Sequence, residues 1–142
     1  GRPAGDLRVP DWVVTTGFVD ARARADLLAA CEVVVLPSPL ESLSLAALEA
    51  WRARRPTLAN ARSEVLAGQT ARSGGGLLYL SARDYARQMS RLASDPGLAA
   101  TLGSRGARFA DGWTWDACAR RWRGLLARVR RPLAAAGEPA PE

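Results

Sequence analysis

The sequence predicts an α/β domain in which helices cover both faces of a parallel sheet. Short runs of apolar, β-branched residues alternate along the chain with longer segments of helical apolar spacing. The run Val33–Leu36 contains no polar residue, which is typical of a strand buried on both faces. No internal repeat is visible, and 142 residues are enough to enclose one hydrophobic core.

Near the start of the chain, the residues indicate a strand followed by a helix. Residues 1–11 are rich in Gly, Pro and charge and form an irregular entry segment in this interpretation. Trp12–Thr16 is a strand candidate that ends at Gly17. Asp20 is the expected N-cap of a helix rich in Ala and Leu that runs to about Ala30.

The segment from Val33 to Trp51 is the part around which the chain is organised. Pro37 and Pro39 end its strand, because neither residue has an N–H for a ladder. Ser44 is the expected N-cap of the next helix, whose leucines and alanines supply an apolar face. A strand, a tight loop and a helix N-terminus together bind anions well, because free amides and the helix dipole converge there.

The next elements continue the alternation. Thr57–Asn60 is predicted as a strand after the turn at residues 54–56. Arg72–Tyr79 is a glycine-rich entry into a further short strand. A flexible turn explains these glycines better than a phosphate loop, because a phosphate loop joins a strand to a helix.

Three helices are predicted in the last third of the chain. Ser81 and Asp84 resemble a capping box, Asp95 caps a helix that begins at the next residue, and Thr114 caps the last helix. We expect the last helix to dock across the domain through one stripe, which comprises Trp115, Cys118, Ala119, Trp122, Leu125, Leu126 and Val129. The domain is therefore expected to span residues 1–131, and residues 132–142 are expected to form a disordered tail.

Composition limits the classes of function. The net charge is +6, all 20 basic residues are arginine, and histidine is absent. The arginines are scattered, so nucleic-acid binding is the weaker explanation of this charge and is not expected. Cys31 and Cys118 match no metal spacing, so no metal site is expected. Free thiols and the lack of a membrane-spanning apolar run favour a cytoplasmic protein.

Two carboxylates bracket the loop after the buried strand. Glu41 lies in the loop and Glu49 inside the following helix, with seven residues between them. A carboxylate near a helix start is favoured by the dipole, so Glu41 alone means little. Glu49 is equally consistent with a solvated helix edge and with a binding residue.

With its flanking residues, this pair resembles the donor-site motif of glycosyltransferase family 4, also catalogued as glycosyl transferases group 1. Residues 35–38 read Val-Leu-Pro-Ser before the pair, and Ala50-Trp51 and Arg55-Pro56 follow it. The usual family version reads Glu-Gly-Phe-Gly, whereas residues 41–44 read Glu-Ser-Leu-Ser. This variant, followed by Leu-Glu-Ala-Trp at residues 48–51, is similar to a bacterial subgroup of the family. The resemblance extends to about Leu126.

The resemblance implies the later part of the C-terminal, Rossmann-like domain of a GT-B enzyme. Such enzymes are retaining glycosyltransferases that transfer a sugar from a nucleoside diphosphate to an acceptor, in glycan or glycolipid synthesis. The family pattern implies that Glu41 is the catalytic residue and contacts the donor sugar, and that Glu49 contacts the ribose. The amides of Ser42, Leu43 and Ser44 would face the sugar and the diphosphate.

The resemblance also assigns a nucleobase contact and several partners. The loop before the first helix implicates Phe18 and Val19, whereas Asp20 is better explained as a helix cap. No metal or other cofactor is implied. The basic pair that clamps the diphosphate and the acceptor domain would precede Gly1, and peripheral membrane association would involve that missing part. The chain alone is therefore not expected to catalyse transfer.

Two departures from the family pattern and two alternatives remain. Arg54 replaces the usual Gly, at a cost of about 1 kcal/mol if the backbone is left-handed there. Residues 62–66 lack the glycines of the next family loop, which weakens the case for a donor contact from it.

The alternatives are a non-catalytic, arginine-rich α/β module that binds RNA or another polyanion, and a degenerate transferase domain kept as a scaffold.

Overall fold

Three strands form one parallel sheet at the centre of the molecule. The computed structural model describes residues 9–135. The strand order is β1-β2-β3, with Val34 opposite Thr57 and Thr57 opposite Gly76. The strands are β1 (Val34–Leu36), β2 (Thr57–Asn60) and β3 (Gly76–Tyr79), and they are connected through α2 (Leu45–Arg52) and α3 (Glu64–Ser73). The predicted α/β fold with a parallel sheet is confirmed.

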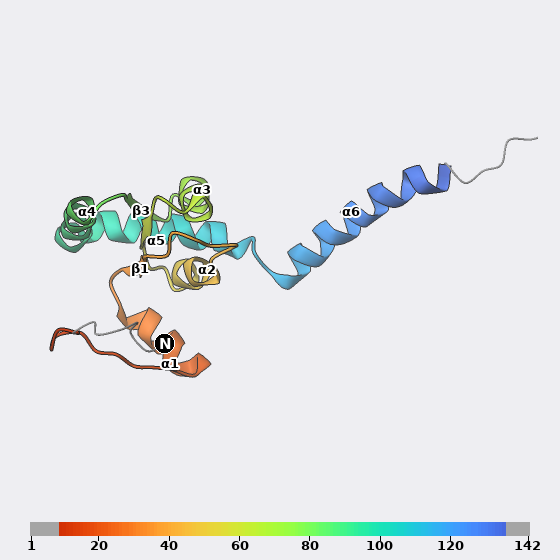
Figure 1. Ribbon diagram of the computed structural model, residues 1–142. Helices are drawn as coiled ribbons and strands as arrows, with labels where there is room; N and C mark the ends of the chain where they lie inside the picture. The colour runs from red at the N-terminus through yellow and green to blue at the C-terminus, as the bar shows by residue number, and fades with distance from the viewer. Residues whose placement is uncertain (1–8, 136–142) are drawn as a thin grey trace, which may run out of the picture.

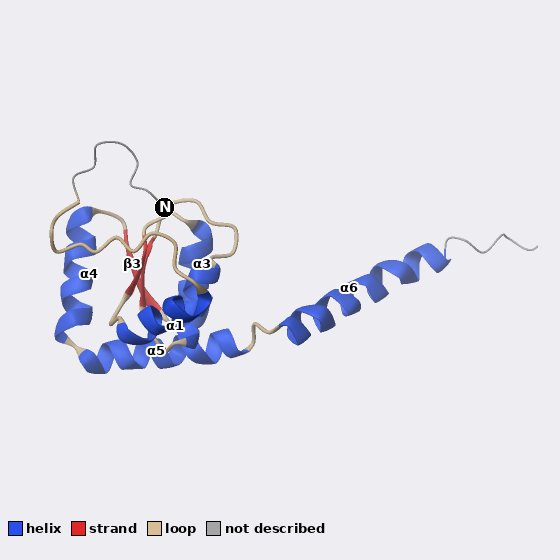
Figure 2. Ribbon diagram, turned by 90° about the horizontal axis from the view of Figure 1, so that it is seen from below, coloured by secondary structure: helices blue, strands red, loops and turns tan. Residues whose placement is uncertain are grey.

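Helices pack on both faces of the sheet (Figure 2). Because successive side chains of a strand point to opposite faces, neighbouring residues belong to different cores. Ala59 packs with α2 and α3 on one face, around the fully buried ring of Trp51. Leu58 packs on the other face with Leu92 of α4 (Ala82–Ser94) and Leu102 of α5 (Pro96–Asp111).

Helix α5 contributes to both cores, so it crosses the sheet at the amino ends of the strands. Two of its glycines allow this close approach: Gly103 faces the carbonyl of Arg54, and Gly106 faces the Trp51 ring. The Trp51 indole N–H donates to the carbonyl of Gly75 at 2.8 Å. The glycine-rich entry to β3 is therefore a tightly packed junction, which corrects the expectation of a flexible turn.

Most predicted helix caps are confirmed by side-chain hydrogen bonds. The Asp20 carboxylate accepts from the Ala23 amide at 2.8 Å, at the start of α1 (Ala21–Ala30). The caps predicted at the starts of α4, α5 and α6 (Trp115–Ala135) are also formed, by Ser81, Asp95 and Thr114 respectively. These caps depend on residues three positions apart, which explains why sequence alone predicts them well.

The predicted first strand is wrong. Residues 13–17 have no regular secondary structure, and the side chains of Trp12 and Val14 are both 84% exposed. A strand needs a neighbour with which to pair its backbone, and no described strand lies beside this segment. Its β-branched composition therefore does not produce a strand within the described part of the chain.

The predicted docking of the last helix is also wrong. Figure 1 shows α6 projecting away from the rest of the molecule. Trp115 is 90% exposed and Trp122 is 59% exposed, because no other described element covers the apolar stripe. The helix continues through Pro132 to Ala135, into the segment expected to be a tail, and residues 136–142 lie outside the described part. Within residues 9–135, no helix is both long and apolar enough to cross a membrane.

Candidate functional site

The candidate site is the loop between β1 and α2, which we call the carboxylate loop (Pro37–Ser44). It lies at the carboxyl end of β1, where α/β sheets with parallel strands bind their ligands. Asn60 lies at the corresponding end of β2 and donates from Nδ2 to the carbonyl of Pro37 at 2.9 Å. Its Oδ1 accepts from the Arg62 amide at 3.0 Å, so both polar atoms of the Asn60 side chain form hydrogen bonds.

A second side chain holds the far end of the carboxylate loop. Gln69 of α3 is 2% exposed, and its Nε2 donates to the carbonyl of Leu43. Gln69 cannot be identified from the sequence, because this bond joins residues 26 positions apart. For Asn60 a signal exists, since a polar side chain at the carboxyl end of a buried strand is a candidate for a site residue.

Ser44 has an unusual environment at the start of α2. Its φ angle is +56°, in the left-handed region that disfavours residues other than glycine. The family pattern has Gly at this position. The side chain is 5% exposed, and its hydroxyl has no partner among the described residues. Helix α2 does begin after Ser44, but the predicted side-chain cap is wrong, because the left-handed backbone leaves the hydroxyl without a capping bond.

The first amides of α2 are also available. The carbonyl of Ser44 accepts from the amides of Ala47, at 3.1 Å, and Leu48, at 3.5 Å. No described group accepts from the amides of Leu45 and Ala46, as expected for the first turn of a helix. Two free N–H groups and the positive end of the helix dipole therefore face the carboxylate loop.

The two carboxylates differ in their surroundings. Glu41 is half-buried in the carboxylate loop, and no described residue forms an ion pair with it. Glu49 lies one turn into α2, and its Oε1 is 3.2 Å from Nη2 of Arg24 on α1. Both residues of this pair line a cavity of about 260 Å³ between α1 and α2. The sequence did not predict a partner for Glu49.

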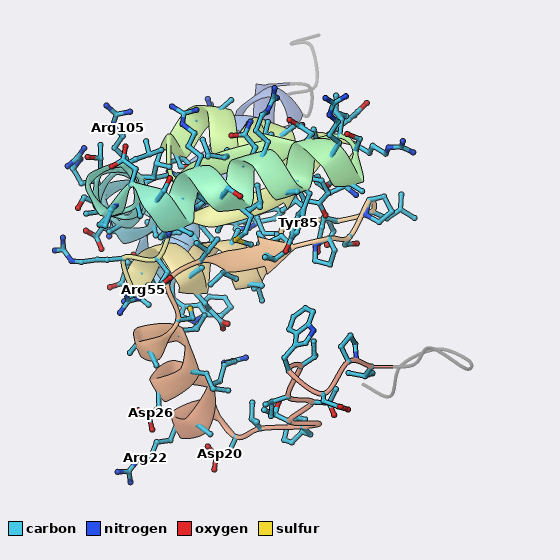
Figure 3. All side chains as sticks on the ribbon, turned by 90° about the vertical axis from the view of Figure 1, so that its left-hand side faces the viewer. Asp20, Arg22, Asp26, Arg55, Tyr85 and Arg105 are labelled. Carbon is cyan, nitrogen blue, oxygen red and sulfur yellow. The ribbon has the colours of Figure 1, made fainter. Side chains whose placement is uncertain are left out.

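The other predicted site residues are less well enclosed. Ser42 is exposed, and Leu43 is 37% exposed, where it borders a separate cavity between α2 and the start of α6. Val19 is half-buried and Phe18 is 97% exposed, so the described structure does not bring the Phe18 ring against the carboxylate loop. Asp20 points away from the body of the molecule (Figure 3). Its role as a helix cap is confirmed.

This arrangement suits a ligand that carries both negative charge and hydroxyl groups. Amides at a helix start stabilise an anion such as a phosphate, and the buried Ser44 hydroxyl can donate a further hydrogen bond. Carboxylates at Glu41 and Glu49 can accept hydrogen bonds from hydroxyls. Among the residues whose positions are described, no cluster of His, Cys, Asp or Glu could hold a metal ion.

Comparison with known proteins gives consistent matches. The family model "Glycosyl transferases group 1" matches residues 3–95. The D-inositol 3-phosphate glycosyltransferase of Streptomyces bingchenggensis is 38% identical over 67% of this chain and 21% of its own length. That of Kineococcus radiotolerans is 39% identical over 70% of this chain and 25% of its own length. That of Streptomyces avermitilis is 36% identical over 82% of this chain and 25% of its own length.

The fold is also similar to that of a solved structure. The sucrose-phosphate synthase of Thermosynechococcus elongatus superposes with a TM-score of 0.69 and 30% sequence identity, over 85% of this chain and 30% of that chain. This chain spans about a quarter of the length of the curated relatives that it matches.

Proposed function

The chain belongs to the glycosyl transferases group 1 family, and on that premise we propose that it forms the donor-binding part of a retaining glycosyltransferase. The donor in this proposal is a nucleoside-diphosphate sugar. The basic pair that holds the diphosphate, the acceptor-binding domain and any membrane contact belong to an upstream part of the same cytoplasmic polypeptide.

The observation that carries this proposal is the environment of Ser44. A left-handed backbone and a buried hydroxyl without a partner both cost stability, by roughly 1–3 kcal/mol each. Such strain is commonly retained where a ligand uses it. We propose that the Ser44 hydroxyl, together with the free amides of Leu45 and Ala46, donates to the diphosphate of the donor.

In this proposal, the same amides also act in the chemical step. As the bond between sugar and diphosphate breaks, negative charge grows on the departing diphosphate, and oriented amides stabilise that charge more than they stabilise the ground state. We assign Glu41 to hydroxyls of the donor sugar, Glu49 to the ribose hydroxyls, and Phe18 and Val19 to the nucleobase. The roles of the glutamates are supported by the position of Glu41 in the carboxylate loop before α2 and of Glu49 one turn into α2.

The test is the substitution Glu41→Gln in a protein that includes the upstream part. We expect turnover to fall on the order of a hundredfold, because an interaction used in the transition state is lost. The free energy of unfolding should change by only about 0.5 kcal/mol, because none of the described residues forms an ion pair with Glu41. Initial rates with a UDP- or GDP-sugar and thermal denaturation measure the two effects.

A matched control is Glu32→Gln. Glu32 is an exposed glutamate just before the amino end of β1, whereas the carboxylate loop follows the carboxyl end of that strand. This variant should keep full turnover. Wild-type turnover in Glu41→Gln would remove Glu41 from the catalytic site.

The exposed arginines of α6 favour a second candidate, a module that binds polyanions. Arg120, Arg121, Arg123 and Arg128 are all exposed on the projecting helix. Contacts between arginine and phosphate would make such binding steeply salt-dependent, and Glu41→Gln would leave it unchanged. Titration with a single-stranded RNA at several salt concentrations distinguishes this candidate from donor binding.

A further inference from the structure

Helix α1 is attached to the rest of the molecule by polar contacts at its C-terminal end and in its first half. None of its residues is buried. At its C-terminal end, the guanidinium of Arg55 donates to the carbonyls of Leu28, at 3.1 Å, and Ala29. Nearer its N-terminus, the Arg24–Glu49 ion pair joins it to α2. Figure 3 shows α1 set apart from the sheet, with Arg55 at the junction.

The ion pair adds little to stability. The side chains of Arg24 and Glu49 are 55% and 36% exposed, and exposed pairs contribute almost nothing measurable in many proteins. Its geometric effect is larger, because it connects the helix that follows Phe18 and Val19 to the helix that follows the carboxylate loop. Arg24 contacts Oε1 of Glu49, and hydrogen bonds among the described residues leave Oε2 unused.

We propose that Arg24 is a positioning residue for Glu49, and this inference rests on the proposed donor site. Arg24 holds one carboxylate oxygen so that the other is oriented to accept a hydrogen bond from the ribose of a nucleoside diphosphate. A guanidinium suits this task, because its rigid planar donors fix the plane of a carboxylate. The same contact keeps Phe18 and Val19, which precede α1, at a set distance from the amides of α2.

The test compares UDP with its 2′,3′-dideoxy analogue, which lacks the ribose hydroxyls but keeps the base and the diphosphate. Arg24→Ala in the full chain should raise the dissociation constant of UDP by roughly fivefold. This is the change in affinity that corresponds to the free energy of an exposed ion pair. Binding of the dideoxy analogue should not change. Arg24→Lys should restore part of the UDP affinity. Amide chemical-shift titration measures each dissociation constant, and thermal denaturation confirms that each variant is folded.

Arg22→Ala is the matched control. Arg22 lies on the same helix, is exposed, forms no ion pair among the described side chains, and points away from the body of the molecule (Figure 3). It should leave both affinities unchanged. In a Glu49→Gln background, Arg24→Ala should add no further loss, because the two residues act as one unit.

Three outcomes overturn this inference alone, and a fourth overturns it together with the proposed donor site. If Arg24→Ala weakens binding of the dideoxy analogue as much as binding of UDP, Arg24 contacts the base or the diphosphate directly. If Arg24→Ala strengthens UDP binding, Arg24 competes with the ribose for the Glu49 carboxylate. If Glu49→Gln weakens UDP binding and Arg24→Ala does not, the positioning role alone fails. If neither Glu49→Gln nor Glu41→Gln has any effect on donor binding or turnover, the proposed donor site fails as well.

Discussion

Two residues show where packing overrides local preference. Ser44 and Arg54 adopt φ angles of +56° and +58°, in the region that favours glycine. The Arg54 carbonyl lies against Gly103 of α5, so contact between α2 and α5 constrains this turn. The left-handed turn at Arg54 agrees with the family pattern, in which glycine follows the helix. The strain at Ser44 could not be predicted from propensity, because serine at a helix start is the usual capping residue.

Arg54→Gly should therefore stabilise the protein. Glycine removes the steric cost of the left-handed backbone, about 1 kcal/mol, although the greater freedom of the unfolded chain offsets part of this gain. Thermal denaturation should show a small increase in Tm. Nucleotide binding should be unchanged, because Arg54 lies at the amino ends of the strands. A decrease in Tm would mean that the arginine side chain makes a stabilising contact.

Ser44→Gly should separate stability from binding. The substitution relieves the left-handed strain and removes a buried hydroxyl that has no partner among the described residues. The greater freedom of glycine in the unfolded chain offsets part of this gain, so the free energy of unfolding should rise by about 1 kcal/mol. If the hydroxyl donates to the diphosphate, the affinity for UDP should fall at the same time. Chemical denaturation and an amide-shift titration measure the two effects. Unchanged affinity would show that the hydroxyl does not contact the ligand.

At the scale of elements, features set by residues close in sequence are predicted correctly, and features that depend on contacts between elements are not. The strand Thr57–Asn60 and the starts of α1, α4, α5 and α6 are predicted from apolar runs, prolines and caps only a few residues apart. Helix α3, which Ser63 caps, was not predicted. The strand predicted at Trp12–Thr16 fails because strand formation requires a partner. The apolar stripe of α6 correctly predicts a helix, but periodicity cannot identify which surface covers it.

The tryptophans of α2 and α6 provide a test of this distinction. Trp51 is fully buried, donates to the Gly75 carbonyl and packs edge-on against Phe109 with the ring centroids 5.7 Å apart. Trp51→Ala should cost roughly 3–5 kcal/mol. Trp122→Ala should change the stability of this chain by only about 0.5 kcal/mol, because the ring is 59% exposed. Urea denaturation measures both, and a large loss for Trp122→Ala would show that α6 docks in solution.

At the scale of the whole molecule, the chain contains one side of the proposed site. The family and the alternation of parallel strands and helices could be predicted from the motif around Glu41 and Glu49 and the apolar runs beside it, whereas the roles of the two carboxylates remain predictions. The contacts of Gln69 and Arg24 could not, because each joins residues about 25 positions apart and has no local signature. The chain spans about a quarter of the length of its curated relatives, and in our proposal the basic pair and the acceptor-binding domain belong to an upstream part.

For this reason, the chain by itself should bind nucleoside diphosphates weakly and transfer no sugar. Its amides, helix dipole and two carboxylates support a dissociation constant in the millimolar range, or about 4 kcal/mol. At a ligand concentration near that constant, binding stabilises the fold by only about 0.4 kcal/mol, so amide chemical shifts are a better probe than Tm. The shifts should centre on residues 18–20 and 41–49 and should saturate with UDP or GDP but not with inorganic phosphate. Equal responses to any polyanion, spread over the α6 arginines, would contradict the donor site and support the second candidate.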